Sequence, residues 1–375
     1  MAKARRGWIL VGGLALGLAG CSGVSGAGRG ADARTPRQEV AYPAEQVVGD
    51  AGLEGLNDEE LHARGTAAFA AADFALAART FDRLLERFPQ SPHRSNALLQ
   101  AGLAYERTQS WAEAQARFAQ LADPEKGTGS ALEASFRLAE AEYHLERYPE
   151  AIRVLRKLAE REDLTAGRRI EARVQQGVCE LEAGDGERAQ GTLREALALY
   201  GSLAEPEEVD SYFPAQAHFF LGEVYRLAFE AAKLDPSHGV DRLGQDLEHK
   251  AELLLSAQGH YLRSIRVGNG HWATASGAQV GSLYENLHAQ MVNTPVPSEL
   301  DAEQAEAYRQ EVRSRVRVLL TKAIGIYERT LEAAERIGSQ STFVERTRES
   351  LHKVKQLLLA DAEAQSTPAA ASPQP

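Results

Sequence analysis

Ten histidines and two cysteines are the residues of this chain most able to do chemistry, yet their spacing predicts no catalytic or metal site. No two histidines follow the His-x3-His or His-Glu-x2-His patterns, which place two metal ligands on one helix face. No phosphate-binding glycine loop followed by lysine occurs, and no Gly-x-Ser-x-Gly nucleophile turn. The sequence therefore predicts a protein that is not an enzyme, with no cofactor, no metal and no small-molecule substrate.

Two local strings come nearest to a site. Cys179 lies in a stretch with helical apolar periodicity and without a His or Asp pattern around it, so we expect a buried structural thiol. The string Gly268–Trp272 (GNGHW) lacks the further glycines and the lysine of a nucleotide loop. We expect a tight turn there, with Trp272 packed beneath it. The many glutamates are expected to be solvated helix faces.

The composition indicates an all-α chain with a strong negative charge. Helix-forming residues dominate, and no alternating run rich in Val, Ile and Thr predicts a strand. The formal net charge is -11, and removal of residues 1–20 with Lys3, Arg5 and Arg6 would make it -14. Such a charge disfavours nucleic acid and anionic lipid surfaces as direct ligands.

Residues 1–20 predict a targeting segment. A basic start (MAKARR) precedes the apolar run Trp8–Leu18, which is too short to span a bilayer. The following Leu18–Cys21 (LAGC) resembles the lipobox of bacterial lipoproteins. That resemblance implies cleavage before Cys21, lipidation of its thiol and attachment to a membrane through the N-terminal lipid. The alternative is a plain secretory signal with an incidental cysteine. By the same resemblance, Ser22 after the cysteine implies the outer membrane.

A repeated pattern of small residues predicts the fold of the remaining chain. Each unit has a small residue in one helical run, and in the next run an alanine followed four residues later by an aromatic residue or leucine. These alanines are spaced 37, 37 and 38 residues apart, at Ala77, Ala114, Ala151 and Ala189. The pattern resembles the tetratricopeptide repeat (TPR), a pair of packed helices that stacks into a solenoid.

The predicted organisation is six helix pairs, the last two with insertions, and a capping helix at 342–362. Asn57 with Glu60 predicts the start of the first helix near Asp58. The segments are a signal peptide at 1–20, a flexible tether at 21–56, four regular repeats at 57–202, irregular repeats and the cap at 203–362, and a disordered tail at 363–375. Periodicity alone leaves open an antiparallel bundle stacked on four repeats.

The face formed by the first helix of each unit is where a TPR protein usually binds its partner. Relatives that clamp a peptide carboxylate use Lys, Asn and Arg there, whereas this sequence has mostly apolar residues, so the clamp is not expected. We predict instead an apolar groove for a hydrophobic or amphipathic peptide. Its lining would be Leu99, Leu103, Phe136, Glu140, Tyr143, Val174 and Val178. Two alternatives stay open: the chain's own linker or inserted segments fill the groove, or the register is shifted by one residue.

The lipobox, the tether and the repeats, the first of which ends in Phe88–Pro92 (FPQSP), together resemble bacterial outer-membrane TPR lipoproteins. One branch of that group serves β-barrel assembly. The other serves gliding-motility and type IV pilus machines, and the inserted C-terminal block 269–338 resembles its long repeats. The implied function is a lipid-anchored scaffold or assembly factor facing the periplasm, which binds envelope proteins or peptides. The alternatives are an accessory role in barrel assembly and regulation of a cell-wall enzyme.

Overall fold

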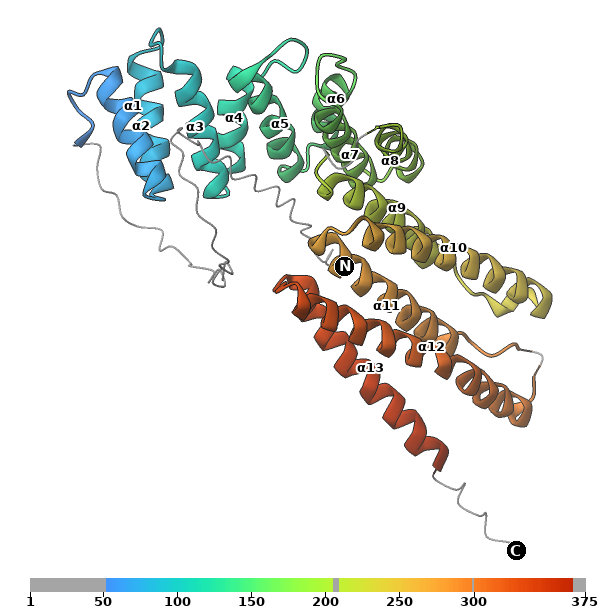
Figure 1. Ribbon diagram of the computed structural model, residues 1–375. Helices are drawn as coiled ribbons and strands as arrows, with labels where there is room; N and C mark the ends of the chain where they lie inside the picture. The colour runs from blue at the N-terminus through green and yellow to red at the C-terminus, as the bar shows by residue number, and fades with distance from the viewer. Residues whose placement is uncertain (1–51, 205–208, 299, 367–375) are drawn as a thin grey trace, which may run out of the picture.

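The computed structural model describes residues 52–204, 209–298 and 300–366, and these ranges are built from α-helices without a β-strand (Figure 1). The prediction of an all-α fold is confirmed. The predicted signal peptide, Cys21 and most of the predicted tether lie outside the described residues. Within the described ranges, no helix combines the length and apolarity needed to cross a membrane.

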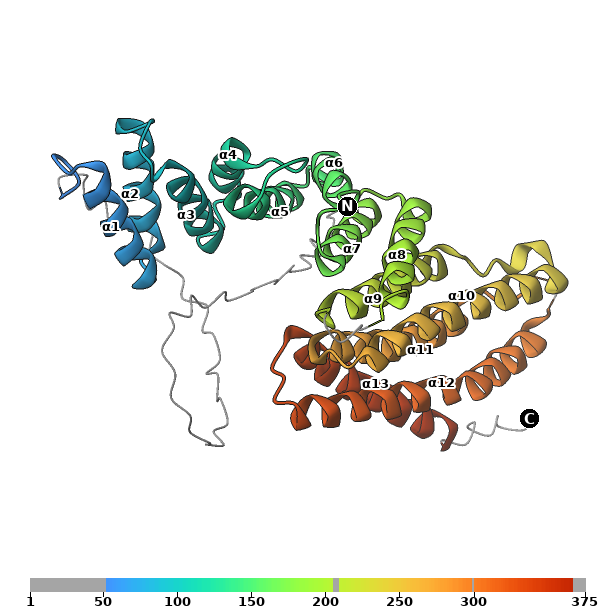
Figure 2. The same cartoon turned by 45° about the horizontal axis from the view of Figure 1, so that its top comes forward.

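In the described ranges the α-helices form six pairs and a final single helix, which follow one another as an arc (Figures 1 and 2). The four short pairs are α1 (Asp58–Ala70) with α2 (Phe74–Arg87), α3 (Arg94–Arg107) with α4 (Trp111–Leu121), α5 (Gly129–His144) with α6 (Tyr148–Ala159), and α7 (Ala166–Glu182) with α8 (Gly186–Gly201). The long pairs are α9 (Tyr212–Ala231) with α10 (Val240–Val267) and α11 (Gly270–Asn293) with α12 (Ala302–Arg336), and α13 (Thr342–Ser366) ends the arc. The capping helix thus continues four residues beyond the predicted end at 362.

A close contact between a small residue and a large side chain joins the two helices of a pair. A Cβ atom added to Gly65 would lie 2.8 Å from the ring of Phe81, nearer than side chains approach in real structures. Only glycine therefore allows α1 and α2 to lie so close. The partners Gly65–Phe81, Gly102–Phe118 and Gly177–Leu193 stand 16 residues apart. The third short pair has two buried residues, Ala139 and Leu155, at the same spacing.

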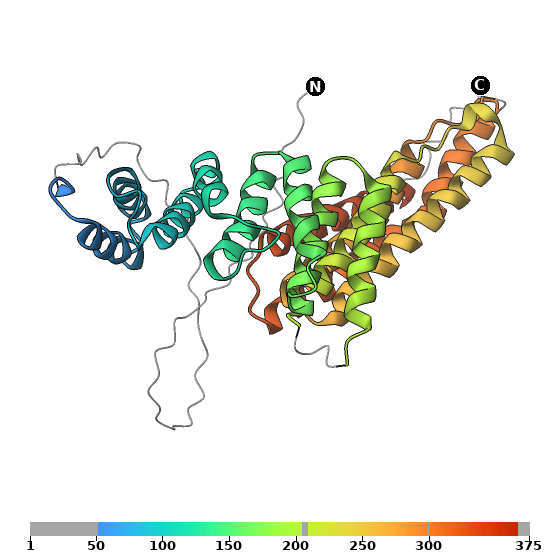
Figure 3. The same cartoon turned by 90° about the horizontal axis from the view of Figure 1, so that it is seen from above.

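The long pairs repeat this contact in spite of their insertions. Gly222 packs against Tyr261 and Gly281 against Tyr327, although 39 and 46 residues separate the partners. The inserted residues mainly lengthen the helices, because α12 has 35 residues where α2 has 14. Seen from above, the long helices project beyond the row of short ones (Figure 3). The C-terminal half therefore continues the solenoid, and the alternative of a separate bundle does not hold.

Part of the insertion in the fifth pair extends its second helix, because α10 begins at Val240 and runs to Val267. Lys250, which is fully buried, explains how the extension is held. Its ammonium donates hydrogen bonds to the carbonyl oxygens of Phe229 and Ala232 at the end of α9. A cation there satisfies carbonyls that the helix itself leaves unpaired.

The turn inside each short pair has the same backbone geometry. One residue adopts the left-handed conformation, and the next residue donates its N–H to a carbonyl in the last turn of the preceding helix. The left-handed residues are Ala72, Gln109, Glu146 and Gly184, with φ of 61°, 58°, 58° and 89°. Three of the four are not glycine, which costs roughly 1 kcal/mol each. The turns recur every 37 or 38 residues, in step with the alanines.

The odd-numbered helices form one layer of the solenoid and the even-numbered helices the other. Contacts run along the odd layer from α1 to α3 and α5, and from α7 through α9 and α11 to α13. An ion pair between Arg168 of α7 and Glu133 of α5, 2.7 Å long, bridges the remaining step. The odd layer is the face that the TPR resemblance assigns to binding, and we call it the inner layer.

Gly281→Ala should lower the free energy of unfolding by about 1–3 kcal/mol, because the added methyl group would overlap the ring of Tyr327. Gly191→Ala is the matched control within α8, where an added Cβ meets nothing within 4 Å. It should stabilise the chain by up to about 1 kcal/mol through helix propensity. Urea titrations followed by circular dichroism compare the two variants. Equal effects would contradict the packing role of Gly281.

Candidate binding surface on the inner layer

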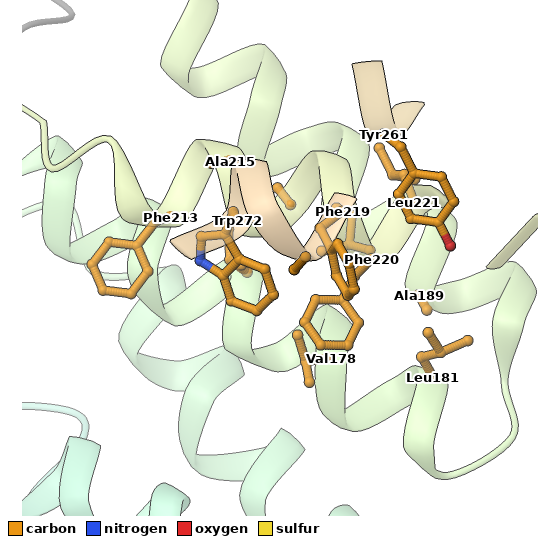
Figure 4. Packing of buried hydrophobic residues seen from close by; sticks show 14 of the residues in the cluster. Val178, Leu181, Ala189, Phe213, Ala215, Phe219, Phe220, Leu221, Tyr261 and Trp272 are labelled. Carbon is orange, nitrogen blue, oxygen red and sulfur yellow. The ribbon is translucent and has the colours of Figure 1, made fainter. Parts of the chain in front are cut away.

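Two residues of the predicted groove belong to the core. Val174 and Val178 of α7 have no exposed surface. Val178 lies in one cluster with Phe219, Phe220 and Trp272, which α9 and α11 contribute (Figure 4). A peptide cannot touch either valine while α9 covers α7, so these positions are core rather than groove lining. The aromatic side chains that cover α7 come from the fifth and sixth pairs. The periodicity of the α7 sequence cannot show that these later helices pack on it.

The remaining apolar positions of the predicted groove are also largely covered. Leu99 and Leu103 are half-buried and pack against the cluster around Phe118. Phe136 is 5% exposed and lies beneath the Arg168 guanidinium, which is 4.1 Å from the ring centroid. Tyr143 is 8% exposed. The apolar character of the inner layer is therefore directed mainly into the solenoid.

Glu140, the one charged residue predicted for the groove, belongs to a network of charges centred on Arg137. The Arg137 guanidinium donates to Glu133 at 3.0 Å and to Glu140 at 3.2 Å, both on its own helix α5. It also donates to Glu106 of α3 at 3.2 Å. The second carboxylate oxygen of Glu106, Oε2, is buried without a hydrogen-bond partner among the described residues.

Arg168 extends the network to the fourth unit. Its guanidinium donates to Glu133 of α5 at 2.7 Å and to Glu171 of α7 at 2.9 Å. The network thus spans α3, α5 and α7 and contains four carboxyl groups but two guanidinium groups. When all four are ionised, negative charge is in excess on a partly buried surface, which is unfavourable without a further cation.

Burial and this excess of charge alter the protonation of the network. Burial and the neighbouring Glu106 raise the pKa of Glu140 to about 8, so this residue is largely protonated near neutral pH. Burial also raises the pKa of Glu106 and of Glu171. Although burial acts in the opposite direction on Glu133, its pKa is lowered by Arg137 and Arg168.

Tyr212 at the start of α9 borders the network. Burial, followed by the charge of Glu140, raises the pKa of its phenol. The hydroxyl is buried without a hydrogen-bond partner among the described residues. The Tyr212 ring lies edge-on to Trp272, with centroids 5.4 Å apart. The surface therefore combines carboxyl groups in excess with a free phenol hydroxyl, a combination suited to a guanidinium or ammonium group.

The arginines of this network are the functional candidates that sequence analysis missed. The expectation that glutamates are solvated is wrong for Glu140 and Glu171, which lie in ion pairs on a partly buried surface. The local signal was present in the spacing of Glu133, Arg137 and Glu140, because residues three and four apart share one helix face. Ion pairs between units carry no such local signal. Arg168 and Glu133, for example, are 35 residues apart in sequence and meet only because the units stack.

The other residues that the sequence singled out have structural roles. Cys179 is 2% exposed, and burial raises the pKa of its thiol, as expected of a structural cysteine. Gly268 ends α10 in a left-handed turn with φ of 90°, and Trp272 is buried behind it, as predicted. In the part of the chain that the structure describes, no three His, Cys, Asp or Glu side chains are placed to hold a metal ion.

Glu140→Gln should weaken the pH dependence of stability. Because the folded state binds the Glu140 proton more tightly than the unfolded chain does, this contribution is full below about pH 4.5 and is lost as pH rises through about 8. Over this window the melting temperature of the variant should fall less than that of the wild type. Glu252→Gln, at an exposed site on α10, is the control and should follow the wild type. Parallel curves for wild type and Glu140→Gln would contradict the raised pKa.

Comparison with known proteins supports the repeats directly. A sequence model of the tetratricopeptide repeat matches residues 62–123 and again 99–164. No curated protein matches the chain.

Two solved structures show weak likenesses. The apo form of RapI is 9% identical, with 82% of this chain and 100% of that chain covered and a TM-score of 0.42. A tetratricopeptide repeat protein from Parabacteroides merdae is 11% identical, with 78% and 98% covered and a TM-score of 0.36. Neither likeness bears on function. The chain therefore carries tetratricopeptide repeats between residues 62 and 164.

Proposed function

We propose that the chain is a lipid-anchored, non-enzymatic scaffold that holds an envelope protein on its inner layer. Tetratricopeptide repeats are protein-interaction modules, which supports the general role. The observation that carries the proposal is the charge network of α3, α5 and α7, with carboxyl groups in excess and the free Glu106 Oε2. It favours a partner segment that brings an arginine or lysine side chain.

Such a basic side chain would complete the network. It would pair with Glu106 and favour the ionised form of Glu140, because a nearby positive charge lowers the pKa of a carboxyl group. Binding would release the Glu140 proton, so affinity should rise between about pH 6 and pH 8.

The proposed location is the periplasmic face of the outer membrane. The support is the lipobox-like Leu18–Cys21 followed by Ser22. We favour a gliding-motility or pilus machine because the fifth and sixth pairs carry long inserted helices, as in that branch of TPR lipoproteins. β-barrel assembly and regulation of a cell-wall enzyme are the alternatives. The proteins that copurify with the chain from detergent-solubilised membranes would distinguish these machines.

Glu106→Gln/Glu140→Gln should reduce recovery of the partner by at least about tenfold, since a charge-assisted hydrogen bond contributes about 1.5–3 kcal/mol. The measurement is quantitative affinity purification of the full chain from solubilised membranes. Glu252→Gln/Glu349→Gln removes two exposed glutamates from α10 and α13 as the matched control. Equal recovery from both double variants would rule out the inner-layer network as the binding site.

Cys21→Ala should transfer the chain from the membrane fraction to the soluble fraction, because the lipid-bearing thiol is lost. Fractionation after carbonate washing measures the effect. Cys179→Ala, which removes the buried cysteine, is the control and should stay with the membrane. Membrane retention of Cys21→Ala would overturn the lipid anchor without affecting the inner-layer site.

A further inference from the structure

A second surface lies on the even-numbered layer, away from the charge network. There a groove of about 650 Å³ opens between α10 and α12, with α11 as its floor. Because α9 and α13 contact α11 from the inner layer, the groove lies on the layer that the inner-layer site does not use. We call it the outer groove.

Large apolar side chains stay open to solvent in the outer groove. Leu262 on α10 is 37% exposed, Val318 on α12 is 53% exposed, and Ile337, which follows α12 as its C-cap, is 55% exposed. Small residues such as Gly270, Ala273 and Gly277 line the floor, and Ile337 packs directly over Gly270. Exposed apolar residues gathered in one groove are typical of an interaction site. Leu255, 62% exposed, continues the row along α10 one heptad before Leu262.

The outer groove is also positive, in a chain whose net charge is -11. Its lining contains Lys322 and Arg329 but no Asp or Glu. Neither cation has an ion-pair partner among the described residues, whereas Arg309 and Arg315 earlier in α12 pair with glutamates of their own helix. The Lys322 ammonium lies 5.5 Å from the centroid of the Tyr284 ring.

Arg329 lies beside Gly325 on the same wall of the groove. One guanidinium nitrogen is 3.5 Å from the place where a Cβ of Gly325 would stand, an ordinary van der Waals distance. Both cations therefore line the groove, and no carboxylate of the described residues forms an ion pair with them. They are seven residues apart on one helix, which puts them two turns or about 10.5 Å from each other on the same face.

We propose that the outer groove binds an amphipathic helix of a partner protein that carries an apolar stripe and carboxylates seven residues apart. Helices wall the groove on both sides, and an amphipathic helix laid between them is an established mode of recognition. A single acyl chain fits less well. Small-ligand sites enclose about 70–90% of their ligand, whereas Val318 and Ile337 remain about half exposed. With the inner-layer site, the chain would hold two partners on opposite layers.

The test uses a fluorescein-labelled, 18-residue synthetic helix with leucines on one face and glutamates seven residues apart beside them. Its counterpart carries lysines in place of the glutamates. Fluorescence anisotropy with the full chain should show at least tenfold tighter binding of the acidic helix. Lys322→Glu/Arg329→Glu should weaken that binding at least tenfold. Arg346→Glu/Arg348→Glu, which reverses two exposed charges on α13, should leave it unchanged.

A second variant keeps the test valid if the charge-reversed chain does not fold. Val318→Asp alters an exposed apolar side chain and should also weaken binding of the acidic helix at least tenfold while circular dichroism stays unchanged. Equal binding of both helices, or binding indifferent to Lys322→Glu/Arg329→Glu and Val318→Asp, would overturn the proposal.

Other occupants of the groove would overturn it as well. Binding of the chain to phosphatidylglycerol vesicles that Val318→Asp weakens, with no binding of the acidic helix, would assign the groove to lipid. A dimer in sedimentation velocity that Val318→Asp abolishes would assign it to a second copy of the chain. Crosslinks from a photoreactive residue at position 318 to residues 22–51 would assign it to the chain's own N-terminal segment.

Discussion

The structure depends on the close approach of the two helices in each unit, which a glycine or alanine on the first helix permits. At Gly65, Gly102, Gly222 and Gly281 an aromatic ring fills the space where a side chain would stand. This contact sets both the distance and the rotation of one helix against the other. Since each unit stacks on the last, it also determines which side chains face the inner layer. The long pairs keep the contact. Their additional residues lie in sequence between the two contacting residues, where the first helix is joined to the second.

The charge network follows from that stacking. Residues about one repeat apart in sequence become neighbours, as Arg137 does with Glu106 and Arg168 with Glu133. Partly buried ion pairs contribute little net stability, because desolvation offsets their attraction. The network therefore adds little to stability, which is consistent with the proposed role in binding a partner's cation. The outer groove has the opposite character, since its cations lack carboxylates and its apolar residues lack a cover.

Local sequence patterns predicted the architecture. Which side chains are exposed on the binding surface depends instead on contacts between units that are distant in sequence. The capping box of Asn57 with Glu60 forms as the sequence indicates, and the small residues recur where the helices pack. The apolar groove was harder to predict, because an apolar residue on the first helix can face a partner or the next unit. Val178 faces the next units, since aromatic residues of α9 and α11 cover it. The pairing of Arg168 with Glu133 likewise requires the three-dimensional stacking.

A double-mutant cycle on Gly102 and Phe118 tests the central claim most directly. The third unit already has alanine and leucine at the corresponding positions, Ala139 and Leu155, both 1% exposed. Gly102→Ala and Phe118→Leu should each destabilise the chain by about 1–3 kcal/mol, through overlap and through a cavity respectively. Combined, they should recreate the pair of the third unit and cost less than the sum by about 1 kcal/mol or more. Strictly additive losses would contradict the claim that this contact holds each unit together.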